Sequence, residues 1–162
     1  CGEPMLAHKA SHEGRLAVDV MAGSKAVFEP AAIPAVVFTD PEIAWCGLTE
    51  TQAKAENCAA EIAKFPWGAS GRAQTLGAEG VTKVVAEPGT GRILGVGIAG
   101  PGAGDLIAEA VLALEMGATT KDLSLTIHAH PTLSETLMEA AEVNLGHCTH
   151  VLPSRKGAPG GH

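Results

Sequence analysis

Residues 80–100 constrain the fold of this chain more than any other stretch, because they have the pattern of a β-hairpin. Two arms rich in β-branched residues, VTKVVA and ILGVGIA, flank a Pro-Gly-Thr-Gly turn. Further strand patterns occupy 35–40, 42–47 and 59–67, and Pro41 separates the first two. The strands and helices do not alternate regularly, as they would in a doubly wound parallel sheet. We therefore predict an α+β fold in which an antiparallel or mixed sheet is flanked by helices.

Four segments carry helix signals. Residues 3–22 are amphipathic, with Pro4 in the first turn, and a capping box opens a second helix over 49–57. Residues 103–117 and a last helix closed by Gly146 each gather apolar and small residues on one face, so we expect both helices to pack on the sheet. The faces consist of Leu106, Ile107, Ala110, Val111 and Leu114 in one helix, and of Leu133, Leu137, Ala140 and Ala141 in the other.

Composition and charge exclude several classes of protein. Of the 162 residues, 46% are hydrophobic and 18% charged, which is typical of one folded domain and not of a disordered chain. The 11 basic and 18 acidic residues leave a net charge of -7, and no basic run exceeds Arg155-Lys156, so nucleic acid is not an expected partner. No apolar run reaches the about 18 to 20 residues that a membrane span needs.

The four cysteines, at positions 1, 46, 58 and 148, form no C-x-x-C pair and no zinc-ligand spacing. This usage indicates a reducing compartment. Cys1 followed by glycine is compatible with a lipidated N-terminus, but a helix pattern follows it where an anchored domain would have a flexible tether. We expect instead that the chain is part of a longer protein.

Gly95, Gly97 and Gly100 spell G-x-G-x-x-G, a pattern typical of dinucleotide-binding loops. In such loops the helix begins near the second glycine, so that its free N–H groups meet the phosphates. Here residues 101–104 delay the helix, and the preceding strand is one arm of a hairpin. We therefore expect these glycines to let backbone segments approach closely, and we predict no nucleotide site.

Two groups of side chains have the chemistry of metal ligands. In the Gly- and Pro-rich tail from residue 147 we expect a solvated coil, with zinc binding as the alternative; the ligands there would be His147, Cys148, His150 and His162. His128 and His130 would share one face of a strand, but no nearby cysteine or aspartate completes a site. We therefore predict no metal site.

The stretch HPTLSE at 130–135 supports two interpretations. Pro131 disfavours helix at His130, and Thr132-x-x-Glu135 is a capping box, so in the first interpretation Glu135 is simply a helix cap. Alternatively, Glu135 accepts a hydrogen bond from one ring nitrogen of His130 and leaves the other nitrogen free to accept a proton. The spacing alone leaves both interpretations open.

Four stretches in the same order resemble the C-terminal portion of the dihydrolipoamide dehydrogenase family, within the pyridine nucleotide-disulfide oxidoreductases. They are PMLAHKASHEG at 4–14, FTDPEIAWCGLTE at 38–50, ILGVGIAGPGAGDLIAEAVLALEMGAT at 93–119 and HAHPTLSETLMEAA at 128–141. MLAHKA and HAHPTLSE are closer to this family than to glutathione or mercuric reductases. The resemblance covers residues 3–145 and implies a dimerisation domain with a sheet flanked by helices.

The resemblance also implies roles for particular residues. His130 falls on the family's catalytic base and Glu135 on its carboxylate partner, with a cis bond before Pro131. His130 would serve the other subunit of a homodimer, by deprotonating a dihydrolipoyl thiol carried on a lipoyl domain of a 2-oxoacid dehydrogenase complex or the glycine cleavage system. Electrons would then pass through FAD to NAD. Flavin contacts would come from residues 5–8, which are Met5, Leu6, Ala7 and His8.

The sequence lacks a C-x-x-x-x-C redox pair, a credible phosphate loop for FAD or NAD, and the Gly-Asp flavin motif that precedes MLAH in the family. We therefore expect FAD and NAD to belong to the full-length parent, and the chain alone to bind no cofactor and to be inactive. A stand-alone dimeric interaction module with the same fold is the alternative.

The resemblance suggests three regions. Residues 1–30 would be a helix and linker that end a flavin-binding region, residues 31–146 the dimerisation domain, and residues 147–162 a flexible tail. The implied location is the bacterial cytoplasm or the mitochondrial matrix.

Overall fold

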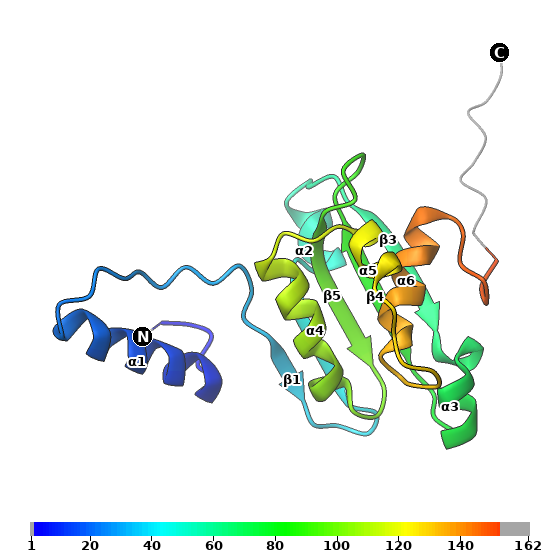
Figure 1. Cartoon of the computed structure of the whole chain (residues 1–162), viewed down its shortest axis with the longest axis horizontal. Coiled ribbons are helices and arrows are strands. Elements are labelled where there is room, and N and C mark those ends of the chain that lie inside the picture. Colours follow the sequence, from blue (N-terminus) through cyan, green and yellow to red (C-terminus); the bar gives the residue numbers. More distant parts are fainter. Residues whose placement is uncertain (1, 153–162) are drawn as a thin grey trace, which may run out of the picture.

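The computed structural model describes residues 2–152, and its centre is one five-stranded antiparallel sheet (Figure 1). The strand order is β1-β2-β5-β4-β3. The predicted hairpin forms the middle of the sheet, where β4 pairs with β5 from Val81 opposite Ala99 onward. The α+β prediction is therefore confirmed, in its antiparallel form. The strands are β1 Ala35–Val37, β2 Ile43–Gly47, β3 Glu61–Pro66, β4 Val81–Ala86 and β5 Ile93–Ala99.

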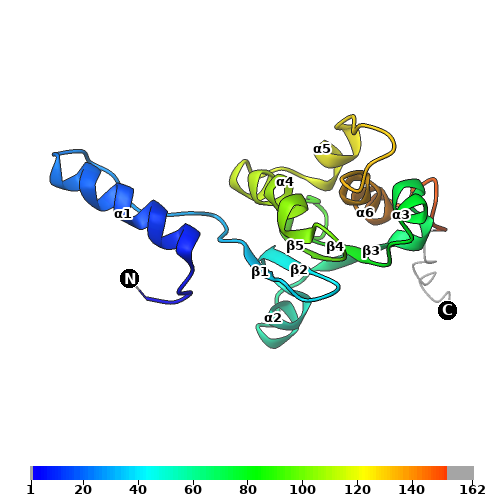
Figure 2. The ribbon, with the colours of Figure 1, turned by 90° about the horizontal axis from the view of Figure 1, so that it is seen from below.

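Most helices cover one face of the sheet (Figure 2). Helix α4 (Ala103–Glu115) packs on β5 and β2, and α6 (Glu135–Leu145) packs on β3 and β4, as their apolar faces predict. Helix α5 (Thr120–Leu125) packs on α6, while α3 (Gly71–Leu76) lies at the same end of the sheet as α6. Helix α2 (Glu50–Ala55), opened by the predicted capping box, lies on the opposite face.

The three glycines of the G-x-G-x-x-G pattern do not form a phosphate loop. A Cβ at Gly95 would lie 2.1 Å from the backbone oxygen of Leu48, so the expected close approach of two backbones is confirmed there. Gly100 instead makes room for an aromatic ring, because its Cβ would lie 2.4 Å from Cζ3 of Trp67. At Gly97 a Cβ would meet open space. Helix α4 begins only at residue 103, after the predicted delay.

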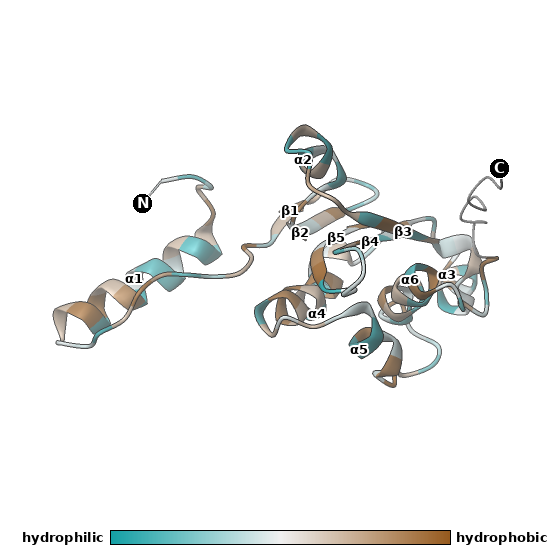
Figure 3. Ribbon diagram, turned by 90° about the horizontal axis from the view of Figure 1, so that it is seen from above, coloured by the Kyte–Doolittle hydropathy of each residue, from teal (hydrophilic) through white to brown (hydrophobic). Residues whose placement is uncertain are grey.

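Helix α1 (Ala7–Met21) begins later than predicted and stands apart from the sheet (Figure 1). Pro4 precedes it, and Leu6 is its N-cap residue, so the expected first-turn role of Pro4 is wrong. The C-terminal half of α1 is hydrophobic (Figure 3), and its residues Val18, Val20 and Met21 are exposed, so no part of residues 2–152 buries them. The amphipathic pattern thus describes a face that the described part of the chain does not bury.

Two short helices were not predicted from the sequence. Helix α3 begins at a Ser70 cap and ends at Gly77 in the left-handed region, and α5 opens with a Thr119-x-x-Asp122 capping box. Both are only about two turns long, too short for a periodic apolar pattern to stand out. Within residues 2–152, no helix has the length and apolar character needed to cross a membrane.

The start of the predicted tail is irregular, as expected, but it is not fully solvated. The chain returns to α6 there, where Cys148 is buried and His150 binds Glu139, while Leu152 is exposed. The chain reverses because Gly146 takes a left-handed conformation (φ 83°) and the N–H of His147 donates to the backbone oxygen of Glu142. The rest of the predicted tail, including His162, lies outside the described residues.

Candidate functional site

His130 lies in the loop between α5 and α6, two residues after His128 and directly before the cis peptide bond to Pro131. The predicted cis bond is confirmed. The loop residues are not a strand, so the expected shared strand face of His128 and His130 is wrong. Their rings bind different carboxylates on different helices, and the two imidazoles do not form a metal pair.

His130 and Glu135 are hydrogen-bonded. Nδ1 of His130 is 2.9 Å from Oε1 of Glu135, and the His130 side chain is 74% exposed. The second oxygen of Glu135 accepts the N–H of Thr132 at 2.8 Å. Because a carboxylate only accepts, Nδ1 of the neutral ring carries the hydrogen and Nε2 is left with a lone pair. The arrangement is that of a base oriented by a carboxylate.

The environment of Glu135 keeps its carboxylate ionised. Burial acts to raise its pKa, but the hydrogen bond from the Thr132 N–H, the bond to His130 and the nearby imidazole charges outweigh it and lower the pKa below the usual value. The predicted capping box forms only in half. Thr132 Oγ1 donates to the oxygen of Ala129, and Ser134 is the N-cap residue, so Glu135 is the first residue of α6 and not the third.

His128 fixes the loop to α4. Its side chain is only 5% exposed, its Nε2 is 2.7 Å from Oε1 of Glu109, and its Nδ1 is 2.8 Å from the backbone oxygen of Thr126. These contacts hold the chain two residues before His130. Sequence reasoning treated His128 as a metal candidate and missed this structural role, because Glu109 is distant in sequence.

A buried chain of hydrogen bonds holds the start of α6 on the sheet. The indole N–H of Trp67 donates to Thr82 Oγ1 at 3.0 Å, and Thr82 Oγ1 is 2.8 Å from Thr136 Oγ1. Thr136 in turn donates to the backbone oxygen of Leu133 at 2.7 Å. The donors and acceptors agree in direction only if the Thr82 hydroxyl donates to Thr136. The contact between Thr82 and Thr136 therefore fixes the position of the neighbouring Glu135, and no sequence motif predicted this contact.

A pocket of about 240 Å³ lies beside the His130–Glu135 pair, between α3 and α6. Its lining includes Phe65, Ser70 and Gln74 on one side, and Glu139 and His150 on the other. Glu139, four residues after Glu135, falls on the same side of α6 and faces the same pocket. That spacing was the signal by which the sequence could have indicated Glu139.

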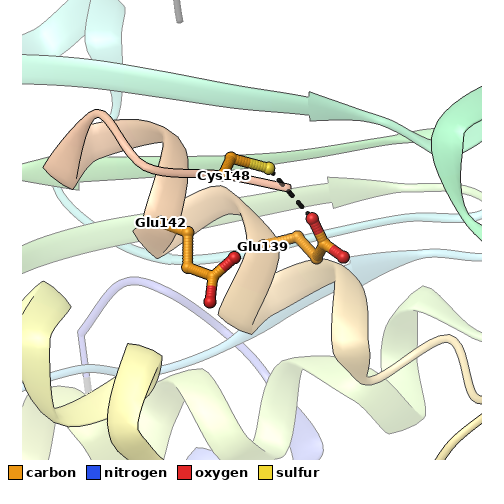
Figure 4. A group of neighbouring side chains, drawn as sticks. All are labelled: Glu139, Glu142 and Cys148. Atoms are coloured by element: carbon orange, nitrogen blue, oxygen red, sulfur yellow. Dashed lines mark hydrogen bonds between the residues drawn. The ribbon is translucent and has the colours of Figure 1, made fainter. Parts of the chain in front are cut away.

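Glu139 is a second carboxylate with two partners. It is 6% exposed and accepts the thiol hydrogen of Cys148 at 2.9 Å (Figure 4). Its other oxygen binds Nδ1 of His150. Burial, together with the hydrogen bond to Glu139, raises the pKa of Cys148 to about 11. Cys148 is thus a protonated thiol at neutral pH.

The residues expected to contact flavin lie elsewhere in the chain. Met5 to His8 stand at the start of α1, where Met5 is 83% exposed and His8 Nε2 is 2.7 Å from the backbone oxygen of Pro34. Helix α1 and the end of the sheet that carries α3 and α6 lie on opposite sides of the chain (Figures 1 and 2). One copy of the chain therefore does not bring these residues to His130.

Comparison with known proteins places the chain in a family. Residues 33–141 match the family described as pyridine nucleotide-disulphide oxidoreductase, dimerisation domain. The chain is 50% identical over 156 residues to a dihydrolipoyl dehydrogenase of Haemophilus influenzae, covering 96% of this chain and 32% of that protein. It is 55% identical over 150 residues to a dihydrolipoyl dehydrogenase of Thermus scotoductus, covering 92% of this chain and 32% of that protein. The chain thus spans about a third of the length of the curated relatives it matches.

Solved structures agree with this placement. LpdA from Mycobacterium tuberculosis superposes with a TM-score of 0.81 at 29% identity, over 87% of this chain and 31% of that one. The HOCl-induced flavoprotein disulfide reductase RclA from Escherichia coli gives a TM-score of 0.80 at 23% identity, over 87% of this chain and 33% of its own, and supports the fold alone. The chain therefore belongs to the dimerisation-domain family of the pyridine nucleotide-disulphide oxidoreductases.

Proposed function

We propose that this chain is the C-terminal interface region of a dihydrolipoyl dehydrogenase, which oxidises protein-bound dihydrolipoamide with FAD as carrier and NAD as acceptor. The main support is the His130–Glu135 hydrogen bond beside a pocket. It occurs in a chain that has about 50% sequence identity to a dihydrolipoyl dehydrogenase over almost its whole length. The stand-alone interaction module remains the second candidate function, since most of the family's other machinery lies outside this sequence.

His130 would act as the general base. Its Nε2 has no hydrogen-bond partner among residues 2–152 and accepts the proton of a dihydrolipoyl thiol, which leaves a thiolate, the nucleophilic form of sulfur. The imidazolium that forms donates through Nδ1 to the ionised Glu135, so the positive charge is stabilised where it develops. Glu135 is itself held by Thr132, so the pair is oriented before substrate arrives.

Residues 5–8 fit one edge of a flavin. They lie at the start of a 15-residue helix, where the Met5 amide already donates to Glu3 Oε2 and the Leu6 amide to the Pro4 oxygen. The amides of Ala7 and His8 are therefore the ones left to face a flavin. Such amides favour negative charge placed near them. When bound in the longer protein, FAD supplies the acceptor for the electrons of the dithiol. Residues 95–100 do not fit NAD, because Leu48 and Trp67 fill the space beside Gly95 and Gly100.

The separation of residues 5–8 from His130 supports a two-chain site. In a homodimer, His130 of one subunit would serve the flavin region of the other. We propose residues 31–146 as the dimerisation domain, residues 1–30 as the end of the flavin-binding region and the remainder as a tail whose start packs on α6. A lipoyl domain would deliver the substrate, and a location in the cytoplasm or mitochondrial matrix follows from the same proposal.

The 162-residue chain alone should be colourless and without lipoamide dehydrogenase activity. The redox disulfide is absent from its sequence and only residues 5–8 are assigned to flavin, which is too small a surface for tight binding. The measurement is a visible spectrum after purification with added FAD, together with an assay of NAD reduction by dihydrolipoamide. A stoichiometric flavin band would contradict the interpretation as an interface region. The longer protein encoded by the same gene should show both flavin and activity; if it encodes no FAD and NAD regions, the interaction module is favoured.

The chain should also form a two-fold symmetric dimer. Large apolar side chains are exposed on and after α4 and α5, which a monomer would leave in water; they are Leu112, Met116, Leu125 and Ile127. Stable obligate interfaces commonly bury more than about 2,000 Å². Light scattering should give twice the chain mass at micromolar concentration. A monomer at high micromolar concentration would show that this region does not dimerise by itself. If the dimer uses this apolar surface, Ile127→Asp should weaken it.

A further inference from the structure

The side chains of Glu139, Glu142 and Cys148 converge where the chain folds back on α6 (Figure 4). Each offers one ligand atom, and these atoms lie within 4.8 Å of one another. We propose that this cluster is a zinc-binding site, formed by one thiolate and two carboxylates beside the His130 pocket. It is separate from the His130–Glu135 pair and does not depend on the proposed enzymatic function.

The fold builds the cluster from two directions. Glu139 and Glu142 are three residues apart on α6, so their side chains leave the helix on neighbouring positions of one face. The left-handed Gly146 then reverses the chain and returns Cys148 to within 2.9 Å of Glu139 Oε2. Sequence spacing suggested the cysteine and the histidines of the tail as ligands, but only this reversal brings the carboxylates to the cysteine.

The donor set suits zinc better than other common divalent ions. Zn²⁺ binds cysteine sulfur and carboxylate oxygen, whereas Mg²⁺ and Ca²⁺ take oxygen ligands almost exclusively. Glu139 Oε2, which accepts the thiol hydrogen in the metal-free chain, is the oxygen that faces the metal position. On binding, a zinc–sulfur bond replaces the sulfur–hydrogen bond and the proton leaves to solvent, so no oxidant or reductant is needed.

His150 acts as a support for the cluster. Its Nδ1 binds the other oxygen of Glu139, Oε1, and so orients Oε2 toward Cys148. Hydrogen bonds to a ligating carboxylate are typical of metal sites and contribute to affinity. Backbone hydrogen bonds from His150 and Val151 to the Cys148 sulfur act to lower its pKa, but burial and the bond to Glu139 outweigh them, so the metal must displace the thiol proton.

The local charge also favours a cation. Helix α6 contains three glutamates and no lysine or arginine, and Glu142 lies in its last turn, where the helix dipole is negative. Among residues 2–152, no lysine or arginine forms an ion pair with Glu139 or Glu142; the one ion-pair partner of Glu139 there is His150. The two carboxylates are therefore not already neutralised by a permanent cation of the described chain.

The test is zinc titration of the metal-free 162-residue chain by calorimetry, with folding checked by circular dichroism. We expect one zinc per chain with release of one proton, and a binding constant about 10- to 100-fold or more weaker in Cys148→Ser. Co²⁺ should give a thiolate charge-transfer band that the same variant lacks. Cys58→Ser is the matched control, because Cys58 is exposed and outside the cluster, and it should bind as the unchanged chain does.

Two further variants test zinc binding independently of Cys148→Ser. Glu142→Gln changes a half-buried ligand and should weaken binding even if Cys148→Ser fails to fold. A chain ending at Leu152 should bind zinc normally, since all three ligands precede it. The proposal is overturned if Cys148→Ser or Glu142→Gln binds zinc as tightly as the unchanged chain, if Co²⁺ gives no thiolate band, or if the chain ending at Leu152 no longer binds.

Discussion

In the full-length parent, His130→Gln should lower lipoamide turnover by about 10²- to 10⁴-fold, the usual contribution of a general base. Glutamine keeps the volume and polarity of the side chain but has no lone pair of comparable basicity. Because the His130 side chain is largely exposed, folding and flavin content should survive. The measurements are steady-state turnover, flavin absorbance and thermal unfolding of the same preparation.

A matched variant separates loss of the base from a general effect of the substitution. His147→Gln makes the same change at an exposed histidine outside the pocket, and its turnover should match that of the unchanged enzyme. Near-normal turnover in His130→Gln would contradict the proposal that His130 is the catalytic base.

Glu135→Gln tests whether the carboxylate does more than cap α6. Gln can still accept the Thr132 N–H, so the helix start should be preserved. A neutral partner stabilises the imidazolium less, so the transfer of the thiol proton to His130 becomes less favourable. The turnover should fall, though less than in His130→Gln. An unchanged turnover would leave Glu135 as a cap alone.

For the isolated chain, Trp67→Ala should lower the free energy of unfolding by about 3–5 kcal/mol, a large share of the roughly 5–15 kcal/mol that ordinary domains have. Trp67 is 0% exposed, packs against Gly80 and Gly100, and donates its indole N–H to Thr82. Trp45→Ala is the matched control, because that ring lies partly exposed on the sheet and its loss should cost clearly less. Urea denaturation followed by circular dichroism measures both. Equal losses would show that the buried ring is not a centre of the core.

The hydroxyl of Thr82 should matter separately from the ring of Trp67. Thr82→Val keeps the shape but leaves the buried indole N–H and Thr136 without this partner, at a cost of about 1–3 kcal/mol. Thr82→Ser keeps both hydrogen bonds and should restore a large part of the stability that Thr82→Val loses. Equal stabilities of the two variants would mean that the hydrogen bonds contribute little.

Local patterns determined the elements whose signals are complete within a short stretch. The hairpin of β4 and β5 needs only two β-rich arms and a turn, and the Thr49–Gln52 capping box needs only four residues. The His130–Glu135 contact also arises between residues five apart, so their proximity could be expected from the sequence. The assignment of a catalytic role to them came from family resemblance and stays a prediction.

Contacts between distant residues were decided only by the tertiary structure. Glu109 on α4 forms a hydrogen bond with His128 in the loop before α6. Thr82 in the sheet forms one with Thr136 on α6, 54 positions away in sequence. Gly146 turned an expected solvated tail back onto α6 and brought Cys148 to Glu139. A hydrogen bond of this kind leaves no periodic trace in the sequence, because either partner alone is an ordinary polar residue. Packing of helices on the sheet is what makes the two members of each pair neighbours.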